Sequence, residues 1–307
     1  MTEKELKKHI SALHINKMHG RMLSLPSLSS SKREILTLYG HHASIERMAG
    51  ITQNLSKYGN ITLPDLPGFG GMDSFYSIGL KPTIENYADY LASFIKLRFS
   101  KKRLSIIAVS YSFPIVTRML QKYPELVKKV DILVSSVGFV HHDDFRIPMW
   151  QQYGVIVLGR VFEHSATAPI FRYTFLQGPA IRLSYKLVRA RHSKMKDASD
   201  DEFNERINAE IKLWQQNDVR TRMKTMADMF NIDVCKKRVD LPVYHISVEH
   251  DRYFDNRIVE QHMRVIYSDF TDIPTIVPGH MPSIVATAEQ AEPFVPKRLK
   301  DLLTNSK

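Results

Sequence analysis

Short apolar runs alternate with amphipathic segments along the first 140 residues of the chain. An apolar run bounded by glycine or proline is typical of a buried strand, whereas apolar residues three and four positions apart indicate a helix. This pattern predicts strands over 33–40, 103–109 and 130–136, and two short strands within 15–26 around a turn at His19–Gly20. It predicts helices over 44–59, 83–97 and 111–122, with Ser44 and Thr83 as N-caps and Gly59 as a stop. This order of elements indicates a parallel sheet with helices on both faces.

Regular alternation stops between His141 and Cys235 and then resumes. Ser199 and Glu202 form a capping box, and it is followed by an apolar stripe at helical spacing: Phe203, Ile207, Ile211 and Trp214. Beyond the interruption, the pattern predicts a strand over 241–251, a helix over 256–266, a strand near 273–277 and a helix around 284–303. We therefore expect one α/β domain over 1–140 and 236–307, split by a helical insertion over 141–235.

Composition and charge narrow the class of protein. The 307 residues include one cysteine, Cys235, which excludes an intrachain disulfide and suits a reducing compartment. No signal-peptide pattern or long apolar span is present, so the sequence predicts a cytoplasmic protein without integral membrane association. The net charge of +11 is interpreted as a solvated surface. No zinc-finger, Walker or RNA-binding motif accompanies that charge, so we expect no cofactor, no metal and no nucleic-acid partner.

Three polar residues follow predicted strands, at the edge where open α/β sheets place their sites. Ser110 ends the strand "SIIAV", Asp251 follows "YHISVEH", and His280 follows "TIVPG". Their order along the chain is serine, acid, histidine. A serine hydroxyl needs a base to remove its proton during attack, and an acid orients the imidazole that does so.

Five segments in the same order and spacing resemble the α/β-hydrolase superfamily, and specifically its capped branch of epoxide and C–C hydrolases. They are "LTLYGHHAS", "LPDLPGFGGMDS", the Tyr123-Pro124-Glu125 triplet thirteen residues after Ser110, "VEHDRYFD" and "VPGHMPSI". The resemblance covers residues 15–139 and 240–305 approximately, and Tyr39 stands where histidine is common in the family.

The resemblance implies an α/β-hydrolase fold and a serine hydrolase acting on a small, largely apolar substrate. Ser110 would be the nucleophile, His280 the base and Asp251 the acid. The backbone N–H groups of His41 and Tyr111 would form the oxyanion hole. The insertion resembles a helical cap over the site, with aromatic and methionine side chains that mostly form its own core.

The turn at Ser110 departs from the usual G-x-S-x-G motif, because Ala108 and Ser112 replace both glycines. These are the smallest side chains that can stand there, whereas Phe113 and Pro114 add bulk at the start of the helix. This departure leaves a second function open, a catalytically inactive ligand-binding or scaffold protein on the same fold. A nucleic-acid binder is a third hypothesis, which rests on charge alone.

Several alternatives concern single residues or short stretches. Asp143 and Asp144 follow the strand at 130–136, where some family members carry the acid, so they compete with Asp251. The stretch "HHDD" (141–144) is interpreted as a solvated hinge rather than a metal site. The basic stretch 181–196 is interpreted as a solvated helix face, with a weak contact to an anionic surface left open. Oligomeric state and substrate identity are open as well.

Overall fold

The computed structural model describes residues 1–188, 199–277, 279–282 and 286–305. Eight strands form one sheet, in the order β1-β2-β4-β3-β5-β6-β7-β8. The strands are β1 (Ile10–Ile15), β2 (Met18–Leu25), β3 (Glu34–Leu38), β4 (Asn60–Pro64), β5 (Leu104–Val109), β6 (Val130–Ser136), β7 (Val239–Val248) and β8 (Tyr267–Thr275). Strand β2 runs antiparallel to both β1 and β4, and the other neighbours are parallel. Strands β3, β5, β6 and β7 are consecutive neighbours, and they include the strands predicted over 33–40, 103–109 and 130–136.

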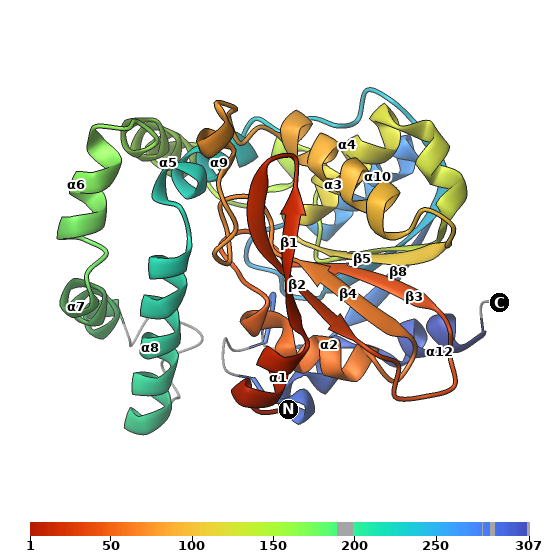
Figure 1. Cartoon of the computed structure of the whole chain (residues 1–307). Coiled ribbons are helices and arrows are strands. Elements are labelled where there is room, and N and C mark those ends of the chain that lie inside the picture. Colours follow the sequence, from red (N-terminus) through yellow and green to blue (C-terminus); the bar gives the residue numbers. More distant parts are fainter. Residues whose placement is uncertain (189–198, 278, 283–285, 306–307) are drawn as a thin grey trace.

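Helices cover both faces of this sheet, as the alternation of strand and helix predicts. Figure 1 shows α3, α4 and α10 on one face, and α2 and α12 on the other. Strand β5 lies between these layers, and all six of its residues are buried. A strand that is buried on both faces favours apolar residues at successive positions, which explains why apolar residues dominate the β5 sequence. The α-helices around the sheet are α1 (Glu3–Lys8), α2 (Ala49–Leu55), α3 (Ile84–Arg98), α4 (Ser112–Lys122), α10 (Asn256–Ile266), α11 (Ala288–Ala291) and α12 (Lys297–Asn305). Together with β1–β8 they make up what we call the sheet region.

Five α-helices within the described residues lie between β6 and β7 in the sequence and stand beside the sheet region (Figure 1). They are α5 (Met149–Phe162), α6 (Thr167–Thr174), α7 (Gly178–Val188), α8 (Asp200–Gln216) and α9 (Val219–Met229). We call residues 149–229 the helical segment. The predicted capping box is confirmed, because the Ser199 hydroxyl accepts from the Glu202 N–H at 3.2 Å. Phe203 and Ile207 from the predicted stripe are buried.

Short 3-10 helices complete the chain: η1 (Glu46–Met48), η2 (Phe75–Ile78), η3 (Pro124–Lys129), η4 (His142–Asp144) and η6 (Glu292–Phe294). Within the residues that the structure describes, none of the helices has both the length and the apolar character needed to cross a membrane.

Three predicted boundaries are wrong. The first hairpin turns at Asn16 and Lys17, which both have positive φ, whereas His19 and Gly20 lie inside β2. A two-residue turn with φ above zero at both positions matches the twist of the two strands. This geometry places the turn at Asn16 and Lys17, although the glycine at position 20 indicates a later turn. The helix predicted over 44–59 is only η1 and α2, with no side-chain cap from Ser44. The helix predicted around 284–303 is divided into α11, η6 and α12. Proline cannot continue an α-helix, which explains the break at Pro296 before α12, and part of the predicted start lies outside the described residues.

Candidate active site

Ser110 occupies a sharp turn between β5 and α4. Its φ is +51°, a left-handed conformation that is uncommon for a residue with a side chain. The turn is held on both sides, because the Ser110 N–H donates to the Ser136 carbonyl at 2.9 Å and the Ser110 carbonyl accepts from the Phe113 N–H at 2.9 Å. Backbone strain of this kind persists where surrounding structure fixes it, and it is common at functional sites.

The bulk of Phe113 next to this turn is accommodated by a glycine elsewhere in the chain. Gly138 lies in the loop after β6, and a Cβ atom placed there would stand 2.7 Å from the Phe113 Cβ. Phe113 is fully buried and its ring lies 5.9 Å from that of Tyr267. Ser112 is also fully buried, and its hydroxyl donates to the carbonyls of Leu38 and Val109. The turn is therefore built without its usual glycines because the neighbouring loop leaves room.

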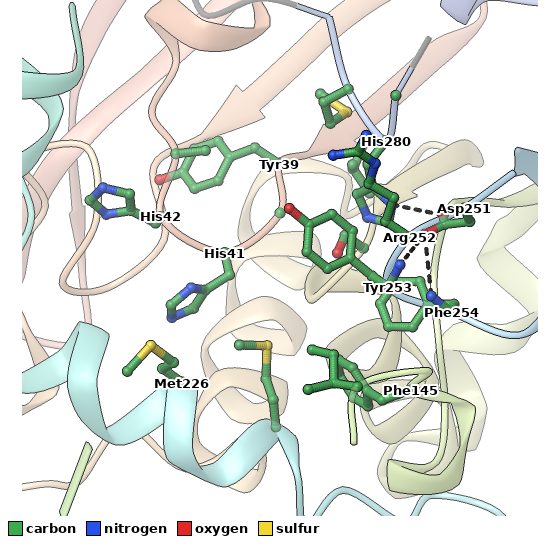
Figure 2. A pocket seen from close by; sticks show the side chains of 18 of the residues that line it. Tyr39, His41, His42, Phe145, Met226, Asp251, Arg252, Tyr253, Phe254 and His280 are labelled. Atoms are coloured by element: carbon green, nitrogen blue, oxygen red, sulfur yellow. Dashed lines mark hydrogen bonds and ion pairs between the residues drawn. The ribbon is translucent and has the colours of Figure 1, made fainter. Parts of the chain in front are cut away.

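Asp251 and His280 are joined directly. Asp251 Oδ2 lies 2.9 Å from His280 Nδ1, and Asp251 Oδ1 accepts from the backbone N–H groups of Tyr253 and Phe254. Burial acts to raise the pKa of Asp251, but these hydrogen bonds and the His280 ring hold that pKa below its ordinary value. Asp251 is therefore an ionised acceptor beside the imidazole. The Tyr253 and Phe254 rings pack against His280 at 5.2 and 5.3 Å (Figure 2).

Ser110, Asp251 and His280 line one cavity of about 480 Å³. No direct hydrogen bond joins the Ser110 hydroxyl to His280 among the described residues. A hydrogen bond between nucleophile and base is often long in a ligand-free enzyme and tightens when substrate binds. The three predicted site residues thus share one space, and the acid–histidine pair is formed.

The loop after β3 lies against Ser110. A Cβ atom placed on Gly40 would stand 3.2 Å from the Ser110 Cβ, so only glycine allows this approach. The next residue, His41, lines the cavity, and its N–H and that of Tyr111 donate to no acceptor within the described ranges. The two predicted oxyanion donors therefore flank the serine with their hydrogen atoms unpaired.

The His41 side chain, unlike its backbone N–H, makes structural contacts. Its Nε2 lies 2.9 Å from the Thr225 hydroxyl of α9, and its ring packs edge-on against Phe69 and Tyr111. Burial lowers the pKa of His41 to about 3, with the charge of Arg222 adding to the effect, so the ring is neutral. His41 therefore links the loop after β3 to α9.

The stretch "HHDD" is not the solvated hinge that the sequence predicts. Asp144 is fully buried, accepts from the N–H groups of Val140 and His141, and lies 2.6 Å from His262 Nδ1. Asp144 therefore pairs with His262, while His280 pairs with Asp251. Buried N–H groups need acceptors, so this carboxylate organises the turn after β6.

A set of metal-ligating atoms lies in the same turn. His141, His142 and Asp143 bring one donor atom each within 4.8 Å of one another. Asp143 is mostly exposed, and His142 Nδ1 lies 3.3 Å from the Ile232 carbonyl. None of the three lines the cavity that contains Ser110.

Sequence reasoning missed a buried polar cluster behind the loop after β3. The Tyr39 hydroxyl lies 3.0 Å from Asp65 Oδ1 and accepts from the Leu66 N–H at 2.7 Å. Arg21 Nε donates to Asp65 Oδ2 at 2.9 Å, and its Nη1 donates to Glu46 at 2.7 Å. Tyr39 therefore fixes the turn that begins at Asp65. Tyr39 and Asp65 both lie in segments that resemble family motifs, but no motif marks Arg21, their distant partner.

The helical segment supplies part of the cavity wall. Met226 and Met229 of α9 and Val155 of α5 line it, together with Arg222, which sequence reasoning also missed. Of the aromatic residues expected in the core of the insertion, Trp150, Tyr173 and Phe175 are instead exposed. A helical stripe does not by itself say whether a neighbour covers it.

No protein-family model and no curated protein sequence matches the chain. Many solved structures are similar to it, and three of them illustrate the range. A membrane phospholipase A described as a bacterial virulence factor is 14% identical with a TM-score of 0.66, over 96% of this chain and 86% of that chain. The enol-lactonase from Burkholderia xenovorans LB400 is 12% identical with a TM-score of 0.65, over 96% and 100%. An epoxide hydrolase is 12% identical with a TM-score of 0.65, over 96% and 97%. Together with the strand order, these similarities show the α/β-hydrolase fold.

Proposed function

We propose that this protein is a serine hydrolase that cleaves an ester, a thioester or an activated C–C bond in a small, largely apolar substrate. The observation that carries the proposal is the strained turn at Ser110 in the same cavity as the hydrogen-bonded Asp251–His280 pair. The similar structures include a phospholipase, an enol-lactonase and an epoxide hydrolase, which is consistent with a hydrolytic role.

In the proposed mechanism, His280 removes the proton of the Ser110 hydroxyl as its oxygen attacks the substrate carbonyl. Asp251 accepts the Nδ1–H of His280, which leaves Nε2 as the base and stabilises the imidazolium. The N–H groups of His41 and Tyr111 donate to the oxyanion of the tetrahedral intermediate. His280 then protonates the leaving group, and water hydrolyses the acyl-enzyme with the same base.

The helical segment is the proposed cap, within the insertion that we assign to residues 141–235. Apolar side chains of α5 and α9 line the cavity, as do Phe145 and Phe230. Excluding water from the site strengthens the hydrogen bonds to the developing charge.

The test is hydrolysis of p-nitrophenyl butyrate, combined with labelling by a fluorophosphonate probe. The Ser110→Ala variant should lose on the order of 10³-fold or more in kcat, because members of a triad act as a unit. Ser112→Ala is the matched control, since its hydroxyl donates only to backbone carbonyls of the turn, and it should retain most activity. Asp251→Asn should lie between the two.

Labelling should map to Ser110 by peptide mass spectrometry. Wild-type turnover that survives Ser110→Ala would refute the nucleophile assignment. Absence of both turnover and labelling in the wild type would favour a binding protein on a hydrolase fold.

A further inference from the structure

His42 lines the cavity and carries a buried N–H without a hydrogen-bond partner among the described residues. Asn217 Oδ1 accepts from the Gly70 N–H at 2.8 Å, so the Asn217 amide nitrogen is the atom that lies 3.0 Å from His42 Nδ1. An amide nitrogen only donates, so His42 Nδ1 is the acceptor. Burial and nearby cations hold the pKa of His42 well below its ordinary value, so the ring is neutral and its proton is on Nε2. This buried Nε2 has no hydrogen-bond partner among the described residues.

The backbone at His42 strengthens this observation. Its φ is +54°, so a residue with a branched aromatic side chain adopts a left-handed conformation. Such strain is retained where the surrounding structure enforces it, and it is frequent at ligand sites. His42 is one of the residues that line the cavity, and its ring points away from His280 and Asp251 (Figure 2).

Arg222 of α9 also lines the cavity and carries a second buried donor without a partner among the described residues. Its guanidinium lies 3.8 Å from the centre of the Trp214 ring, and the His42 ring lies 4.4 Å from that ring. The Arg222 Nε is buried and has no hydrogen-bond partner among the described residues. Because both groups pack on one indole and both line the cavity, their donors belong to one part of the wall.

The charge around these donors is positive. The charged groups that line the cavity are Arg47, Arg222, Arg252 and the Asp251–His280 pair. Arg47 lies 3.7 Å from Glu210, which is not part of the lining. Burial lowers the pKa of Arg222 to about 10, an effect that the Glu210 carboxylate partly offsets, so the guanidinium stays charged. Even with Glu210 counted, the wall around His42 keeps an excess cation. A buried guanidinium and an unpaired N–H are costly unless an acceptor meets them, and an anion meets both.

We propose that His42 and Arg222 form an anion subsite, and that the substrate carries a carboxylate-like group away from the bond that is cleaved. The rest of the cavity wall is largely apolar, with Phe145, Ile147 and Met229 among its residues. The substrate class is therefore an amphipathic ester, thioester or ketone with one anionic end. This inference rests on the proposed function for the reaction that the substrate undergoes. Binding of an anion at the subsite does not depend on that reaction.

The kinetic test compares matched pairs of substrates at pH 7.5. The first pair is 4-acetoxybenzoate, which carries a carboxylate on the leaving group, and its methyl ester, which is neutral. The second pair is mono-p-nitrophenyl adipate, which carries a carboxylate on the acyl group, and its methyl ester, which is neutral. In at least one pair, kcat/KM of the wild type should favour the anion by about 10- to 100-fold, the scale of hydrogen bonds to a charged group.

The Arg222→Met variant should abolish this ratio, whereas Arg222→Lys should keep part of it because the charge remains. Arg220→Met is the matched control. Arg220 lies on the same helix and also stacks on an aromatic ring at 3.8 Å, that of Tyr76, but it does not line the cavity. The control should keep the wild-type ratio. Circular dichroism of each variant checks that it is folded.

A binding test separates failure of the subsite from failure of the hydrolase. Isothermal titration of the Ser110→Ala protein should show that monomethyl adipate binds at least about 10-fold more tightly than dimethyl adipate. Adding Arg222→Met should remove the difference. Turnover of neutral esters with no anion preference in either assay would overturn the subsite and leave the hydrolase. A preference in titration without any turnover would support the subsite and overturn the hydrolase.

Discussion

The sheet region and the helical segment hold themselves together in different ways. One continuous apolar cluster runs through the sheet region, from the first helix to the last. The helical segment contains two small clusters, one around Met223 and one around Phe203. Its outer helices leave large apolar side chains in solvent, such as Trp150 (74% exposed) and Leu187 (77%). The sheet region therefore derives its stability from long-range packing, whereas the helical segment has little core of its own.

Helix α9 fastens the helical segment to the sheet region. The Asp218 N–H donates to the Gly68 carbonyl at 2.8 Å, and the Gly70 N–H donates to Asn217. Thr225 meets His41 further along the helix. Helix α8 adds contacts of its own, since Trp214 packs on His42 and Glu210 lies 3.7 Å from Arg47. The cavity thus has one wall within the large core and another attached through α8 and α9, and the difference can be tested on each side.

The largest expected effect is on the sheet side, at Gly70. Its φ is +61°, and a Cβ atom there would overlap the buried Asp65 carboxylate. Gly70→Ala combines an unfavourable left-handed backbone with displacement of that carboxylate from Arg21. We expect the free energy of unfolding to fall by about 3 to 5 kcal/mol. Urea denaturation followed by circular dichroism measures it, and a loss below about 1 kcal/mol would contradict the close packing of this turn.

A smaller effect is expected where α5 meets α9. A Cβ atom on Gly159 would stand 2.7 Å from the Ala227 Cβ and 2.7 Å from the Met223 carbonyl. Gly159→Ala should therefore lower the midpoint of urea denaturation, by an amount equivalent to about 1 to 3 kcal/mol.

Gly154 on the same helix provides the control. It is exposed and nothing lies within 4 Å of a Cβ placed there. Gly154→Ala should stabilise the protein by about 0.5 to 1 kcal/mol, since alanine favours the helix. If both variants shifted stability in the same direction, the α5–α9 contact would not be the tight one described.

The smallest effect is a pH dependence in the sheet region. His245 of β7 is 2% exposed, lies 2.9 Å from the Ser135 hydroxyl, and has a pKa lowered by burial to about 4. Between pH 6.5 and 4 the unfolded chain binds a proton there that the folded protein does not. The contribution of neutral His245 to the free energy of unfolding is complete above pH 6.5. It decreases as the pH is lowered, by up to about 1.4 kcal/mol per pH unit.

The comparison is made between wild type and His245→Gln, by urea denaturation at pH 7.5 and pH 5.5. Over this range the wild type should lose about 1 kcal/mol more than the variant, because glutamine does not titrate. Equal losses in the two proteins would show that His245 is protonated in the folded state.

The sheet region was largely predictable from sequence because its signals are local and strong. The run 104–109 is apolar apart from Ser105, and Thr83 caps α3 through the Asn86 N–H as its position predicts. Family motifs placed Ser110, Asp251 and His280 at strand ends, and the structure brings them to one cavity. Their catalytic roles remain a proposal.

The remaining features depend on contacts between distant parts of the chain, which a single sequence does not display. Gly138 makes room for Phe113 across two strands, and no motif around Ser110 announces it. Nothing in the sequence distinguishes Arg222 from other helical cations, whereas in the structure its guanidinium packs on Trp214, which also contacts His42. The exposed faces of α5 to α7 show the same limit, because periodicity indicates an apolar face but not its neighbour.

The position of Trp214 has an optical consequence. The chain has two tryptophans, Trp150 and Trp214. The first is largely in solvent, whereas the indole of the second contacts both His42 and Arg222. In a Trp150→Phe chain, the remaining fluorophore would sit against the two groups that we assign to the anion, so its emission would report occupancy of the cavity without any added label. Fluorescence titration with monomethyl adipate would then follow binding directly, in a protein that carries its own reporter.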